Sequence, residues 1–397
     1  DLHSFPTRRS SDLDLNGILI TFGDNDTFPL WYAQEVEGFR TDVRILNYTL
    51  SGMYWYVEQL YNKLYESEPV DFTLTKDFYG LGKDVVYIQD KTSDYIEVAD
   101  ILALLRDNPG RFKMRDSRGE EAIVLPTNRF KITLDIPDLV ERGIIPADKA
   151  EMVDPVIRWQ IKKGSLFRHE LMMLDIIGTN KFRRDINIMN PSYIRDVYPL
   201  INNYCVQDGM NYKLTPCPSK VYQPVIFDPQ ENRYTVQQFT EETYDFFLNG
   251  YTDSLGTHPL AWGNLNADIY VDPVSINMGT VQRQTFTVAA RELLMKGDTA
   301  RARQMMEHAD QFFPSKNFAS DKYSMMGIEV YYEACGKERA TQLWDEIYTY
   351  YDQSLKYYLQ YVQAGKSQHV QKLVEECDQM FYGLHQIADK VLNDKEI

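Results

Sequence analysis

Residues 17–29 are Gly-Ile-Leu-Ile-Thr-Phe-Gly-Asp-Asn-Asp-Thr-Phe-Pro, and they carry the strongest structural signal in this chain of 397 residues. The first six form a short apolar, β-branched run that ends at a glycine, which is typical of a buried strand. The polar loop that follows offers Asp26 or Thr27 as a helix N-cap, with Pro29 in the first turn. The pattern therefore predicts a strand, a loop and a helix that continues over residues 30–37.

A second strand is expected at residues 42–47, which completes a strand–helix–strand unit. Such a unit favours a right-handed crossover between two parallel strands. Further strands are expected at 85–88 and 185–189, helices at 54–65, 96–105 and 170–177, and two paired strands at 122–125 and 130–134 around Pro126. Together these elements predict an α/β fold class with a partly parallel sheet over residues 14–220.

The C-terminal part of the chain has an almost entirely helical pattern. Helices are expected at residues 281–296, 298–312, 321–334 and 337–361. Gly297 and Gly336 begin similar small-residue corners, where small side chains let two helices approach, and this resembles tetratricopeptide-like hairpins. We therefore expect an all-α, helical-hairpin region over residues 281–397, joined to the α/β domain by a connecting region at residues 221–280.

The chain is strongly acidic, with a formal net charge of −16 and a pI near 4.9. This balance repels phosphate groups, so a general role in binding nucleic acid or anionic lipid is excluded. No run of eighteen apolar residues occurs, so no membrane-spanning segment is expected in the sequence as it stands. Cys205 and Cys217 can form a disulfide in an oxidising compartment, and two thiols are equally compatible with their spacing.

The candidate ligand or metal site is formed by Asp24, Asn25 and Asp26. These residues follow the first strand, at the edge where open α/β sheets bind ligands. Two carboxylates one residue apart can share a divalent cation such as Mg²⁺ or Mn²⁺, which in turn can hold a phosphate. Capping of the next helix is the interpretation that we favour. A third interpretation is that these residues contact a membrane-embedded part of the same protein.

No other constellation of reactive residues stands out. The histidines fall into neither His-x-x-x-His nor His-Glu-x-x-His, which argues against a zinc hydrolase. A Gly-x-Ser-x-Gly elbow and a glycine-rich phosphate loop are absent from the sequence. The tyrosines of residues 348–361 have the spacing expected for the core and rim of a helix pair. We assign no catalytic residue and no cofactor beyond the candidate divalent cation.

Residues 3–13 are similar to the translation of a common sequencing adapter. We expect residues 1–13 to be an artefact, and the native protein to continue upstream of Asp14.

Residues 16–38, followed by Arg40-Thr-Asp-Val-Arg44, closely resemble a family of multi-pass bacterial membrane proteins. The family is common in Bacteroidetes, was long carried as a domain of unknown function, and is related to protein O-mannosyltransferases of the GT-C type. Weaker similarity continues through residues 170–177, 207–216 and 262–265 and into the helical tail, so the resemblance covers most of residues 14–310. A polar strand at residues 185–189, where relatives have an aromatic end, departs from the pattern.

The resemblance implies a membrane enzyme that moves a sugar, expected to be mannose, from a polyprenyl-phosphate donor to a Ser or Thr hydroxyl of an exported protein. The full-length protein would lie in the bacterial inner membrane, with this segment periplasmic and an N-terminal transmembrane bundle as its partner. In such enzymes the acidic catalytic residue lies in a loop among the first membrane helices. No position here matches it, so the segment itself is expected to be non-catalytic.

Two other functions stay open at this point. The helical pairs can form a tetratricopeptide-like interaction module that grips a partner peptide. Alternatively, residues 24–26 can bind a metal and a sugar nucleotide in an independent soluble enzyme.

Overall fold

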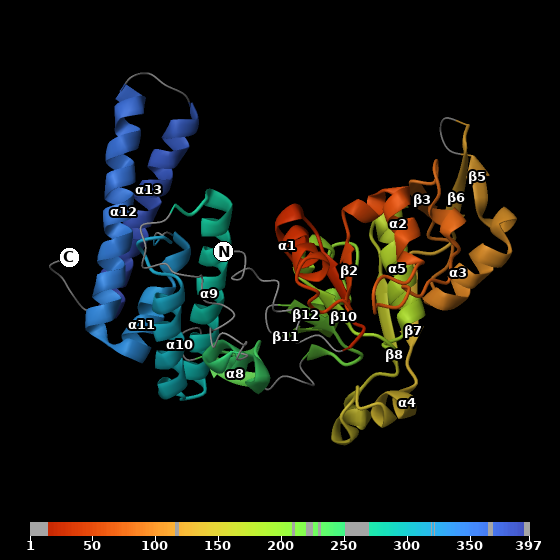
Figure 1. Cartoon of the computed structure of the whole chain (residues 1–397), viewed down its shortest axis with the longest axis horizontal. Coiled ribbons are helices and arrows are strands. Elements are labelled where there is room, and N and C mark those ends of the chain that lie inside the picture. The colour runs from red at the N-terminus through yellow and green to blue at the C-terminus, as the bar shows by residue number, and fades with distance from the viewer. Residues whose placement is uncertain are drawn as a thin grey trace. The chain divides into compact units, whose positions relative to one another are not determined.

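The computed structural model describes residues 15–115, 119–208, 211–219, 225–228, 232–250, 270–318, 320, 322–363 and 368–392. They form two compact units that divide between Val225 and Ile226. The N-terminal unit is α/β with mixed sheets, and the C-terminal unit is mainly helical (Figure 1). This order of fold classes confirms the prediction at that level, whereas the tetratricopeptide-like assignment stays a prediction.

A five-stranded sheet organises the N-terminal unit, in the order β11-β12-β10-β1-β2. The strands are β1 (Ile18–Thr21), β2 (Arg44–Asn47), β10 (Ile186–Ile188), β11 (Cys205–Asp208) and β12 (Asn211–Leu214). β1 pairs in parallel with β2 on one side and with β10 on the other, which confirms the predicted parallel pair. All residues of β1 are buried, as expected for a strand inside the sheet.

Two smaller sheets share the core of this unit. One has the order β5-β6-β3-β9 and the other β4-β7-β8. Their strands are β3 (Val85–Ile88), β4 (Ile96–Glu97), β5 (Lys113–Arg115), β6 (Glu121–Leu125), β7 (Arg129–Thr133), β8 (Val156–Gln160) and β9 (Ser165–Phe167).

The expected pairing of the strands around Pro126 is wrong. β6 pairs in parallel with β3, and β7 pairs antiparallel with β8. A tight hairpin needs residues with positive φ between its strands, and no residue between β6 and β7 has one. Instead the hydroxyl of Thr127 accepts a hydrogen bond from the backbone N–H of Arg129 at 3.0 Å, and the chain passes from one sheet to the other.

The helices of the N-terminal unit are α1 (Asp24–Glu35), α2 (Tyr54–Leu60), α3 (Val98–Asp107), α4 (Ile136–Glu141), α5 (Arg168–Asn180) and α6 (Ile201–Tyr204). Almost every residue of α5 is buried. The helix predicted at residues 170–177, with Gly178 directly after it, continues in the structure to Asn180, so Gly178 lies inside α5. A Cβ at Gly178 would stand 2.1 Å from Cγ1 of Val98, so the glycine is needed for the close packing of α3 against α5.

The C-terminal unit begins with the two-stranded sheet of β13 (Val225–Asp228) and β14 (Arg233–Val236). Its helices are α8 (Glu241–Asn249), α9 (Pro273–Met295), α10 (Thr299–Phe312), α11 (Gly327–Cys335), α12 (Lys337–Gln363) and α13 (Gln368–Ile387). Consecutive helices from α9 onward pack on one another, and α12 and α13 lie side by side as the longest hairpin (Figure 1). Within the described ranges, no helix is long and apolar enough to cross a membrane.

The two glycine corners have a different physical basis from the one expected. Gly297 has φ +79° and Gly336 has φ +97°, and a Cβ at either position would meet nothing within 4 Å. These glycines are therefore required by the left-handed backbone at the end of α9 and α11, and not by close approach of two helices.

Candidate functional site

The carboxyl ends of β1, β2 and β10 meet at one edge of the five-stranded sheet, because these three strands are parallel. The connection after β1 leads to β2 on one side, and the connection after β10 leads to β11 and β12 on the other, so the two connections diverge between β1 and β10. Such a switch point leaves a crevice in open α/β sheets, and ligands bind there. A cavity of about 270 Å³ occupies it, lined by Phe22, Gly23, Tyr48, Thr49, His169 and Tyr193.

A second cavity of about 610 Å³ adjoins the first and shares His169 with it. It is lined by residues 52–55, by Leu81, Gly82 and Asp84, and by Phe167 and Arg168. We call the two cavities together the switch-point cleft. The cleft brings together side chains from the loops after β1, β2 and β10, from α2, and from the start of α5.

Exposed aromatic side chains surround the cleft. Trp55, Phe167 and Tyr193 are 54%, 50% and 66% exposed. The ring of Tyr193 stacks on Phe22 with centroids 4.9 Å apart, and Phe167 stacks on His169 at 5.9 Å. Large apolar surfaces that stay open to solvent in a concave region are typical of binding sites.

His169 is the polar centre of the cleft. Its ring lies edge-on to Tyr48 at 4.7 Å, and no residue in the described ranges hydrogen-bonds to either ring nitrogen. Burial is the main cause that lowers the pKa of His169 below its ordinary value of 6.5, against the opposing effect of Glu170. The imidazole is therefore neutral at pH 7, with one nitrogen as a donor and the other as an acceptor.

Arg168 holds the rim of the cleft together. Its side chain is only 5% exposed, and it donates to the carbonyl oxygens of Gly52 and Gly80 and to the carboxylate of Asp84. These contacts tie the short helix η3 (Leu50–Gly52) and the loop before β3 to the start of α5. Because the guanidinium is paired with a carboxylate, the pair adds no net charge to the cleft.

The predicted site residues Asp24, Asn25 and Asp26 lie at the start of α1, beside the cleft. Gly23 is the N-cap, so the expectation that Asp26 or Thr27 would occupy the N-cap position is wrong. Asp26 is instead the third helical residue, and its carboxylate accepts from the backbone N–H groups of Phe22 at 2.9 Å and Gly23 at 2.7 Å. This geometry is a helix-capping interaction.

Other parts of the same loop fix the ends of the strands. The hydroxyl of Thr27 donates to that of Thr21 at 2.7 Å, and the amide of Asn47 donates to Thr27 at 2.8 Å. Pro29 lies in the second turn of α1 and not in the first, since the helix begins at Asp24. Across the described ranges, no group of three or more His, Cys, Asp or Glu side chains could hold a metal ion. The divalent cation at residues 24–26 stays a prediction.

Cys205 starts β11, and Cys217 is buried just after β12. Both are thiols in the structure. Burial raises the pKa of Cys205 to about 12, so the thiol is unreactive as a nucleophile at neutral pH. The disulfide between them stays a prediction.

Sequence reasoning missed the residues that line the cleft. Trp55, His169 and Tyr193 lie in three segments that are far apart in the chain, and none belongs to a recognised motif. The available signal was position at or shortly after the end of a predicted strand, where ligand contacts occur in parallel sheets, and it applies to Phe22, Tyr48 and Tyr193.

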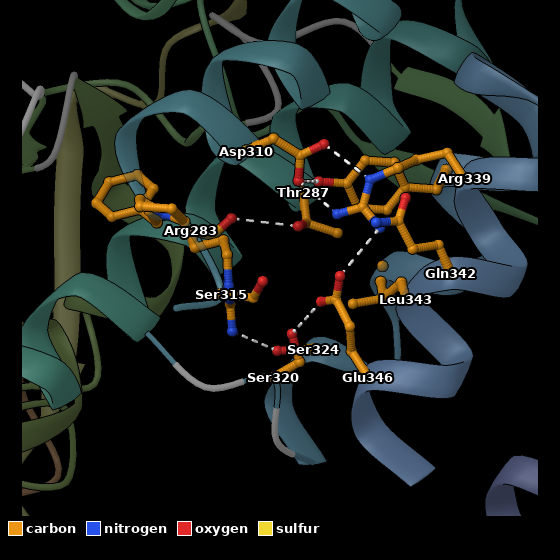
Figure 2. Close-up of a pocket in the computed structure, with 14 residues that line it drawn as sticks. Arg283, Thr287, Asp310, Ser315, Ser320, Ser324, Arg339, Gln342, Leu343 and Glu346 are labelled. Carbon is orange, nitrogen blue, oxygen red and sulfur yellow. Dashed lines mark hydrogen bonds and ion pairs between the residues drawn. The ribbon is translucent and has the colours of Figure 1, made fainter. Parts of the chain in front are cut away.

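The C-terminal unit contains a separate polar pocket of about 400 Å³ between α9, α10, α11 and α12 (Figure 2). Arg339 makes a bidentate contact with Asp310, at 2.9 and 2.6 Å, and its guanidinium lies over the ring of Tyr331 at 4.5 Å. Tyr331 also donates to Asp310 at 2.5 Å. We call Asp310, Tyr331 and Arg339 the helix clamp, because they join α10, α11 and α12.

The polar side chains on the opposite wall of this pocket also hydrogen-bond to one another or to the backbone. Arg283 donates to Ser324 at 2.6 Å, and Ser320 donates to Glu346 at 3.0 Å (Figure 2). Arg283 also donates to the carbonyl oxygen of Phe318 at 2.9 Å. Two cations and two carboxylates thus balance one another around the pocket. Such a polar network holds the helices α9, α10, α11 and α12 in a fixed arrangement.

The family model described as TMEM260-associated domain 2 matches residues 8–233, which is more than half of the chain. The matched range includes every residue that lines the switch-point cleft and ends before α8. No curated protein and no solved structure matches the chain.

Proposed function

The chain belongs to the TMEM260-associated domain 2 family, and from this premise we propose that it is the extracytoplasmic portion of a membrane glycosyltransferase related to protein O-mannosyltransferases. The complete enzyme would lie in the bacterial inner membrane, with this portion in the periplasm against a transmembrane bundle of the same protein. It would transfer mannose from a polyprenyl-phosphate donor to a hydroxyl of an acceptor protein. This portion would position the acceptor and take no part in the bond-making step.

The observation that carries this proposal is the switch-point cleft within the range matched by the family. The cleft is concave and open to solvent, and Trp55 and Phe167 present aromatic surface there. Aromatic side chains give large contact areas at low cost in conformational entropy, which suits recognition of a polypeptide or of a sugar attached to it.

The test is a transfer assay on the full-length enzyme in membranes, with polyprenyl-phosphate mannose and a Thr-containing acceptor peptide. Deletion of this portion is expected to lower acceptor glycosylation, and Trp55→Ala to raise the KM for the acceptor while the KM for the donor stays constant. The matched control is Tyr332→Ala, which removes a 38% exposed aromatic ring on α11, outside the matched range. Sugar transfer that proceeds unchanged after the deletion would refute the proposal.

A second candidate function concerns the helical unit alone. The α12–α13 hairpin exposes Tyr348, Tyr350 and Tyr357, at 43%, 42% and 55%, along with Tyr382. Such tyrosines are common in protein-binding surfaces, so we propose as the alternative that this hairpin is an interaction module. Tyr348→Ala combined with Tyr357→Ala would then abolish binding of an acceptor protein and leave transfer to a short acceptor peptide intact. Equal loss with protein and peptide would contradict it.

A further inference from the structure

The electrostatics of the switch-point cleft favour an uncharged ligand. Arg168 and Asp84 neutralise each other on the rim. The start of α1 is the place where a phosphate would bind in many α/β proteins, but the carboxylate of Asp26 already accepts the N–H groups of Phe22 and Gly23 there. A phosphate or carboxylate would meet this negative charge and find those two donors occupied.

The shape and lining of the larger cavity favour a ligand with an apolar face. Trp55 and Phe167 are half-exposed, and Leu81 is 85% exposed beside them. The ring C–H groups of a pyranose form an apolar face that packs flat on an aromatic side chain, while its hydroxyls point outward from the ring edge. The volume of about 610 Å³ lies within the range of small-molecule sites, roughly 300–1,000 Å³.

His169 adds a requirement that a purely apolar ligand cannot meet. The neutral imidazole offers one donor and one acceptor, and within the described ranges neither nitrogen has a hydrogen-bond partner. A hydroxyl can both donate and accept, so one sugar hydroxyl can hydrogen-bond to whichever ring nitrogen faces the cavity. A polyprenyl chain or an aliphatic side chain satisfies neither nitrogen.

Gly52 keeps the imidazole open to the cavity. A Cβ at this position would stand 3.6 Å from Nδ1 of His169, and any longer side chain would extend over the ring. Gly52 does not have a positive φ, so its backbone conformation does not require glycine. The absence of a side chain at Gly52 therefore keeps His169 accessible from the cavity.

We infer that the switch-point cleft is a binding subsite for a neutral pyranose, packed on Trp55 and Phe167 and hydrogen-bonded to His169. The inference rests on the proposed function for the identity of the sugar, which is then mannose. The subsite would hold mannose that is already attached to the acceptor, since a sugar still joined to its phosphate donor carries the negative charge that the cleft disfavours.

The test uses the full chain and saturation-transfer difference NMR. The probes are a peptide with one α-mannosylated threonine, the same peptide without the sugar, and methyl α-mannopyranoside. We expect the two mannose-containing probes to bind, with transfer strongest to the ring C–H protons, and the bare peptide to bind at least about tenfold more weakly. Polyprenyl phosphate in detergent micelles should not compete.

Two variants probe the two halves of the subsite. Trp55→Ala removes the exposed stacking surface, and Gly52→Val fills the space in front of His169; each should weaken mannoside binding about tenfold or more. Tyr332→Ala on α11 is the matched control and should leave binding unchanged. Far-UV circular dichroism of each variant confirms that it is folded. Equal binding of the bare peptide, competition by polyprenyl phosphate, or binding that survives both Trp55→Ala and Gly52→Val would overturn the inference.

The outcome separates this inference from the proposed function. Loss of acceptor glycosylation on deletion, together with no mannoside signal, refutes the subsite and leaves the positioning role standing. A mannoside signal that disappears in both variants, together with unchanged transfer on deletion, supports the subsite and refutes the role in acceptor positioning.

Discussion

Replacing Asp310 with alanine should destabilise the C-terminal unit, because this carboxylate is the centre of the helix clamp. It accepts two hydrogen bonds from Arg339 and one from Tyr331. After the change the nearest carboxylate to the Arg339 guanidinium is that of Glu346, with its oxygen 3.8 Å from Nη1. Breaking one side of a fully buried ion pair costs about 3–5 kcal/mol.

The clamp is not fully buried, so the expected cost is smaller. The side chains of Arg339 and Asp310 are 23% and 38% exposed. Water can therefore solvate part of the Arg339 guanidinium after Asp310 is removed. We therefore expect Asp310→Ala to lower the free energy of unfolding by about 2 kcal/mol. Tyr331→Phe removes one hydrogen bond while keeping the ring under the guanidinium, and should cost about 1 kcal/mol.

The assay is urea unfolding of the full chain followed by circular dichroism at 222 nm, with a double-mutant cycle between Asp310→Ala and Arg339→Met. A coupling free energy of about 1–2 kcal/mol is expected, because the two residues interact directly. Asp352→Ala, which breaks an exposed ion pair with Lys356 on α12, is the matched control and should leave the midpoint unchanged. Additive effects within about 0.5 kcal/mol would refute the clamp as a coupled unit.

Three further predictions concern the N-terminal unit, each measured by thermal or urea unfolding followed by tryptophan fluorescence. Gly178→Ala should destabilise it by about 1–3 kcal/mol, since the new methyl group overlaps Val98; an unchanged midpoint would mean that α3 and α5 separate easily. Asp26→Ala should cost about 1 kcal/mol through loss of the capping carboxylate, and added Mn²⁺ should not alter that difference, whereas a metal-dependent difference would favour the cation site. For His169, a folded-state pKa below 6.5 means that the unfolded chain binds the proton more readily. Its contribution is therefore complete above pH 6.5 and declines as the pH falls through the lower folded-state value. The stability of the native chain relative to His169→Gln should fall between pH 7.5 and pH 5, and a constant difference would contradict this.

Local patterns in the sequence were sufficient for much of the fold. The apolar run of β1, the polar loop after it and the second strand predicted a parallel pair, because backbone hydrogen bonding and side-chain alternation act over a few residues. Helices α9 to α12 were predicted from the same kind of signal. Helix α13 lies in the region predicted to be all-α, but its bounds were not predicted, although Val370, Leu373, Cys377 and Leu384 follow the three-to-four-residue spacing of a helix.

Long-range packing decided the remaining features. β6 and β7 look like a hairpin from their spacing, yet each has its partners elsewhere, because strand pairing depends on residues that are distant in the chain. Gly178 looks like a helix end, and its real role is set by Val98 on another helix. The same reason applies to the switch-point cleft. Trp55 in α2, His169 in α5 and Tyr193 after β10 come together only when three distant segments pack around the sheet edge, and a local sequence pattern contains no information on such distances.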